Sequence, residues 1–91
     1  MEKIEKTGVI AQNAGCKIVR KVLRKGQEMP RHDHPGEQVL ISMTSGTLLC
    51  NFDDGVALLA EGDVVQFEGE RFVTLQAQEE NTTFLVMLLK R

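Results

Sequence analysis

Hydrophobic residues occur along this chain in short runs, and turn-forming residues separate the runs. Apolar or alternating stretches of strand length lie at 39–43, 63–67, 72–77 and 83–89. Glycine or proline falls between most neighbouring stretches, at a spacing that is typical of an all-β sandwich or barrel. The pattern contains no linker and no internal repeat. It therefore predicts one all-β domain that covers residues 1–91.

A tight hairpin is the clearest local prediction. Asp54 and Gly55 stand between two apolar runs in LLCNFDDGVALL, and an Asp-Gly pair in that position favours a two-residue β-turn. Because side chains alternate along a strand, one face of the first strand should carry Leu48, Cys50 and Phe52, and the other Thr47, Leu49 and Asn51.

Two segments depart from simple alternation. In segment 16–24, apolar residues recur at helical spacing, so a short amphipathic helix is one interpretation. Its β-branched residues and glycine-bounded ends favour a strand instead. Segment 83–89 is apolar on both faces, which predicts a central strand or one that a partner covers.

Composition excludes several classes of protein. A chain of 91 residues buries little more than ~60% of its unfolded surface, so its core is modest. Association would add to this burial, and we therefore expect a homodimer. The net charge is −2, with 11 basic and 13 acidic residues interspersed, which argues against binding nucleic acid through a basic face. There is no Trp or Tyr, so base stacking would depend on four Phe.

Targeting signals and cysteine pairs are also missing from the pattern. The start of the chain has no apolar run of signal-peptide length, and no segment approaches the ~20 apolar residues of a membrane span. Cys16 and Cys50 form no CxxC pair, and Cys50 falls on the expected inner face of the hairpin, so it is interpreted as a core thiol. We expect a cytoplasmic protein with no membrane partner.

The candidate chemistry lies in GQEMPRHDHPGEQ, which contains both histidines of the chain. In an extended segment, His32 and His34 point to the same side and can supply two nitrogen ligands to one ion. Glu37 and Gln38 follow at the start of the next strand, and either can add an oxygen ligand. Such a set suits Zn, Fe, Ni, Cu or Mn without choosing among them. The alternative interpretation is a polar pair in an exposed loop.

The same residues resemble the first motif of the cupin superfamily, in which a glycine, two histidines, a third ligand and a strand-ending glycine follow one another. The matching residues are Gly26, His32, His34, Gln38 and Gly46. The resemblance implies a small antiparallel β-barrel, the double-stranded β-helix or jelly-roll-like fold. It also implies a metal site in which Gln38 takes the third position, with Glu37 as the alternate.

The second cupin motif is degenerate in this chain. EGDVVQFEGERFVTLQAQEE contains the expected Gly-Asp at residues 62–63 and the expected turn between two strands, but it has no histidine. The resemblance places the missing metal ligand near Phe72 or Val73, and alternation along the strand favours Val73. Glu68 stands near the position of the usual proline.

Three functional hypotheses follow. The first is a cupin-type metalloprotein in which His32, His34 and Gln38 hold a divalent ion. The second is a metal-free barrel that binds or senses a small molecule, with the histidines as hydrogen-bonding or titrating groups. The third is an interaction protein that dimerises through an apolar strand. The sequence leaves the substrate, the reaction and even the presence of catalysis open.

Overall fold

The computed structural model describes all residues 1–91, and its regular structure consists entirely of strands. No helix in it is long and apolar enough to cross a membrane. The nine strands are β1 (Gly8–Gln12), β2 (Cys16–Leu23), β3 (Glu28–His32), β4 (Glu37–Ser45), β5 (Thr47–Phe52), β6 (Gly55–Ala60), β7 (Val64–Glu68), β8 (Val73–Ala77) and β9 (Thr82–Lys90).

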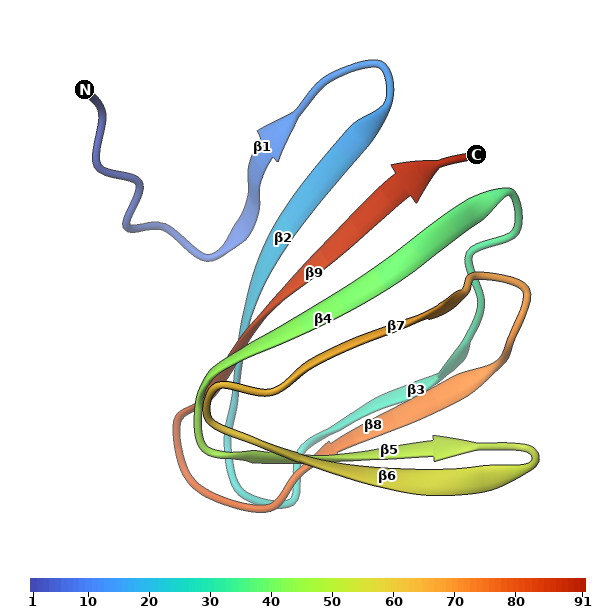
Figure 1. Cartoon of the computed structure of the whole chain (residues 1–91). Helices are drawn as coiled ribbons and strands as arrows, with labels where there is room; N and C mark the ends of the chain where they lie inside the picture. Colours follow the sequence, from blue (N-terminus) through green and yellow to red (C-terminus); the bar gives the residue numbers. More distant parts are fainter.

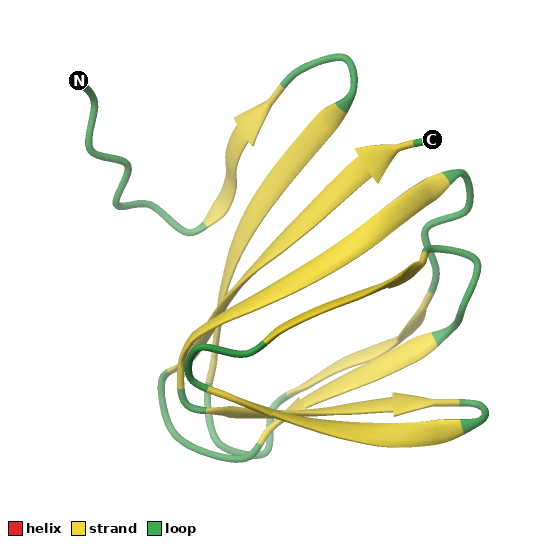
Figure 2. Cartoon of the chain, in the orientation of Figure 1, coloured by secondary structure: helices red, strands yellow, loops and turns green.

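The strands form two antiparallel sheets that face each other (Figure 1). One sheet has the order β1-β2-β9-β4-β7 and the other β3-β8-β5-β6. The chain crosses between them repeatedly, as in a jelly roll. The strands predicted at 39–43, 63–67, 72–77 and 83–89 are confirmed as β4, β7, β8 and β9. The expected all-β, jelly-roll-like fold is confirmed; its two sheets share no paired strands and are not closed into one continuous barrel (Figure 2).

The core lies between the two sheets and consists of side chains from their inner faces. On β4, Val39, Ile41 and Met43 are each at most 3% exposed, and the residues between them face the outer side. Phe84 of β9 and Leu48 of β5 are completely buried. Burial of this single apolar layer is the main favourable term in folding so small a chain.

Local predictions from alternation hold in the hairpin and in β9. Phe52 pairs with Gly55 across the predicted turn, and Leu48 and Cys50 face the core. Strand β9 lies between β2 and β4 and is therefore central, as its apolar pattern predicted. Segment 16–24 resolves as strand β2, which pairs with β9 along its whole length.

Gly46 makes the sharp connection from β4 in one sheet to β5 in the other. Its φ is +79°, a conformation that L-residues with a side chain rarely adopt. A Cβ atom at this position would also lie 2.7 Å from the Cα of Thr82. Thr82 cannot move aside easily, because it is fully buried and its hydroxyl donates a 2.8 Å hydrogen bond to the carbonyl of Glu79.

We therefore predict that Gly46→Ala destabilises the protein by about 3 kcal/mol or more, from backbone strain and collision together. Gly26→Ala is the matched control, since Gly26 has φ +83° but nothing within 4 Å of the added Cβ. The control should lose only about 1–2 kcal/mol. Urea denaturation measures the free energy of unfolding of both variants. Equal losses of that free energy would contradict the steric role assigned to Thr82.

Candidate functional site

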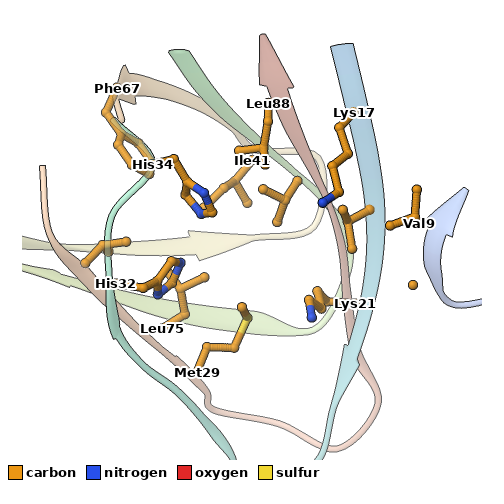
Figure 3. A pocket seen from close by; sticks show the side chains of 14 residues that line it. Val9, Lys17, Lys21, Met29, His32, His34, Ile41, Phe67, Leu75 and Leu88 are labelled. Atoms are coloured by element: carbon orange, nitrogen blue, oxygen red, sulfur yellow. The ribbon is translucent and has the colours of Figure 1, made fainter. Parts of the chain in front are cut away.

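A cavity of about 320 Å³ lies between the sheets, and β1, β2, β3, β4, β7, β8 and β9 contribute to its lining (Figure 3). Nine of its 14 lining residues are hydrophobic. Its polar side chains are two histidines and two lysines, and no Asp or Glu lines it. A mostly apolar hollow with a few convergent polar groups is the usual form of a small-molecule site.

His32 enters this cavity because β3 is irregular. The register with β8 shifts between Met29, which pairs with Leu75, and His32, which pairs with Val73. Between these two pairs, β3 has two residues where β8 has one. The extra residue makes a β-bulge, which changes the direction of the side chain that follows it. The Nδ1 atom of His32 lies 2.7 Å from the carbonyl oxygen of Pro30. A carbonyl can only accept, so Nδ1 carries the proton, and the imidazole form of His32 then has its lone pair on Nε2.

The loop after β3 places His34 beside it. The backbone N–H of His34 donates to the carbonyl of Gly69 at 2.7 Å, and the N–H of Gly69 donates to the carbonyl of Glu37 at 2.8 Å. A Cβ on Gly69 would collide with the carbonyl oxygens of His34 and Glu37, so this close pairing of loops requires glycine. The two imidazole rings consequently meet edge to face, with centroids 5.1 Å apart.

The electrostatic environment keeps His34 neutral. Burial lowers the pKa of His34 below its ordinary 6.5, and the nearby charges of His32 and Lys17 lower it further, against the opposing effects of Glu37 and Asp33. At neutral pH the His34 imidazole therefore carries one N–H donor and one acceptor nitrogen.

Lys17 and Lys21 are the site residues that sequence reasoning missed. Both lie on the inner face of β2 with Val19 between them, and both line the cavity. The signal was present in the sequence. Segment 16–24 failed to alternate because lysines occupy two inner positions, while Ile18 and the 44% exposed Val22 lie on the outer face.

Gln38 is not brought together with the histidines. It pairs in register with Glu68 and Leu89, which are exposed, whereas the adjacent Val39 is buried. Alternation therefore turns Gln38 to the outer face of the sheet, and it does not line the cavity. This placement corrects the expected orientation of the third ligand. Glu37 does not line the cavity either, although its charge raises the pKa of His34.

The donor set does not fit a resident metal ion. Protein metal sites need three or four ligands, and the structure contains no group of three or more His, Cys, Asp or Glu that could hold one. Val73, at the position where the resemblance expects another histidine, is 2% exposed and lines the cavity beside His32, its neighbour across the β3–β8 pairing. The remaining polar lining groups are ammonium cations, which repel a metal.

A cysteine nucleophile is equally unsupported. Burial raises the pKa of the Cys50 thiol to about 11, which keeps it protonated. The interpretation of Cys50 as a core residue is confirmed by its complete burial.

The lowered pKa of His34 predicts that stability falls with acid. The unfolded chain binds a proton near pH 6.5, before the folded chain does, so stability declines as pH drops below that value and levels off below the folded pKa. Urea denaturation between about pH 7.5 and about pH 5.5 measures this decline. His34→Gln should flatten it, and an unchanged slope would contradict the assigned environment.

Comparisons with known proteins identify the fold. No family model matches the sequence, and no curated protein matches it significantly. Solved structures do match. A conserved protein of unknown function from Streptococcus pyogenes is 25% identical with a TM-score of 0.79, over 91% of this chain and 71% of that one.

Two further matches carry a family name. A cupin superfamily protein from Desulfitobacterium hafniense is 18% identical with a TM-score of 0.81, over 97% of this chain and 84% of that one. An RmlC-like cupin from Shewanella frigidimarina is 17% identical with a TM-score of 0.79, over 98% and 84% of the two chains. This chain therefore has the double-stranded β-helix fold of the cupin superfamily, as its two motifs predicted.

Proposed function

We propose that this protein binds a small organic molecule between its sheets and does so without a resident metal ion. The observation that carries the proposal is the lining of the cavity, which combines nine hydrophobic residues with four basic side chains and no carboxylate. The hydrophobic residues would bury the body of the ligand, and the basic groups would fix its orientation.

The size of the cavity restricts the ligand. At about 320 Å³ it lies at the lower end of the range for small-molecule sites, about 300–1,000 Å³. The two imidazoles supply the directional contacts. In its imidazole form His32 offers Nε2 as an acceptor, because its Nδ1–H already donates to the carbonyl of Pro30, and His34 offers one donor and one acceptor. This set suits a ligand with a hydroxyl or another polar hydrogen near its oxygen atoms.

A metal held by His32 and His34 is the second candidate, and a specific observation favours it. Both rings line one cavity, and the Nδ1–H···O=C bond of His32 is the outer-shell contact that metal-ligating histidines usually make. Two imidazoles alone would hold the ion weakly, because further ligands would have to come from water or from the bound molecule.

Elemental analysis and native mass spectrometry of untagged protein separate the two candidates, with a His32→Ala/His34→Ala double variant as reference. We expect no stoichiometric metal in the parent protein, even after incubation with Zn, Ni, Mn and Fe salts. Stoichiometric metal that disappears in the double variant would establish the second candidate and overturn the metal-free proposal.

We also predict that Val73→His creates a metal site, because residue 73 lines the cavity next to His32 on the neighbouring strand and would add a third imidazole. Zn²⁺ at about 100 times its dissociation constant should then raise the unfolding temperature by about 10 °C or more. Gln38→His is the matched control, since Gln38 faces outward, and it should show no such shift. A shift of equal size in both variants would contradict the two orientations.

A further inference from the structure

We propose that the ligand of this cavity is an organic anion, a small carboxylate with an apolar body, and that Lys17 and Lys21 bind its charge. The inference rests on the proposed function, since it names the chemical class of the molecule in the same cavity. It also assigns a role to two residues that the cupin motifs do not include.

The first observation is that both lysines occupy positions that belong to the core. Lys17 pairs with Leu88 and Lys21 with Phe84, which are 6% and 0% exposed. Alternation places all four side chains on the inner face of the sheet. Lysine seldom occupies such a position without a partner, because partial desolvation of the ammonium group is unfavourable.

The second observation is that neither lysine has a partner within the chain. The four ion pairs of the structure all involve other residues, and no side-chain hydrogen bond from Lys17 or Lys21 is found among those of the protein. No acidic residue lines the cavity. Two half-buried cations without an internal counter-ion leave an anionic ligand as the group that would compensate their charge.

The third observation is the direction of the side chains. Figure 3 shows the amino groups of Lys17 and Lys21 on the wall formed by β2, across the pocket from the rings of His32 and His34. The charge of Lys17 is close enough to His34 to lower its pKa. A ligand that contacts the histidines therefore lies within the electrostatic field of the lysine wall.

The apolar lining decides between classes of anion. Val73 and Leu75 form part of the wall beside His32, so the ligand must bury hydrocarbon as well as charge. A carboxylate on a hydrocarbon body meets both demands better than inorganic phosphate, which has no apolar surface to bury.

The test uses matched pairs of small molecules, each a carboxylate and its primary amide, such as hexanoate with hexanamide and benzoate with benzamide. Ligand-observed NMR and isothermal titration calorimetry measure binding to the parent and to Lys17→Met, Lys21→Met and the double variant. Methionine keeps an unbranched stem and removes the charge. Lys25→Met is the matched control, because Lys25 is exposed and does not line the cavity.

We expect carboxylates to bind more tightly than their amides, and each cavity lysine variant to lose about tenfold or more in carboxylate affinity. Lys25→Met should bind as the parent does. The variants should also unfold at the same or a higher temperature, because a binding role leaves the ligand-free protein with an unfavourable, partly desolvated charge. A structural role would instead lower the unfolding temperature.

Four outcomes would overturn the inference. The first is that amides bind as tightly as carboxylates, and the second is that lysine variants keep full carboxylate affinity. Either result would rule out an anionic ligand bound by the lysines and would leave the cavity as a binding site. Lysine variants that unfold at a clearly lower temperature would assign Lys17 and Lys21 to structure. Absence of binding by every pair would instead overturn the proposed function itself, together with this inference.

Discussion

Apolar packing between the inner faces of two antiparallel sheets is the interaction on which the rest of this structure depends. Fully buried residues such as Phe84, Leu48 and Leu75 join sheets that share no backbone pairing. In the space that β2 of one sheet and β3 of the other line, this packing is incomplete and basic side chains replace apolar ones. The site is therefore an unfilled part of the core, and its hydrophobic walls continue the layer that stabilises the fold.

Backbone irregularities place the polar groups in that space. The bulge in β3 turns His32 inward, and the contact of Gly69 with the loop carbonyls holds His34 beside it. The lysines need no such device, because regular alternation along β2 points them into the cavity. A rigid sheet thus supplies the charges, while an irregular strand and a loop supply the directional groups.

The strands could be predicted from sequence because alternation and turn residues encode them locally, as Asp54-Gly55 and segment 39–43 illustrate. The division of the strands into two sheets that share no pairing could not be predicted in this way, because it depends on pairing between segments far apart in the sequence. Gln38 was predicted to point toward the histidines because its spacing matches the cupin motif. Alternation along β4 predicts the opposite, since Val39, Ile41 and Met43 mark the inner face and Gln38 therefore belongs to the outer one. Lys17 and Lys21 were overlooked for a related reason. Charged residues at core positions disturb alternation, and such disturbances tend to occur at functional sites.

The central claim is that the space between the sheets is the binding site, and backbone-amide NMR during titration with a bound carboxylate tests it most directly. The account predicts that chemical-shift changes concentrate on β2, β3 and β8, at residues such as Val19, His32 and Val73 that line the cavity. Changes confined to the outer faces of the sheets, at residues such as Leu40 and Leu58, would contradict it.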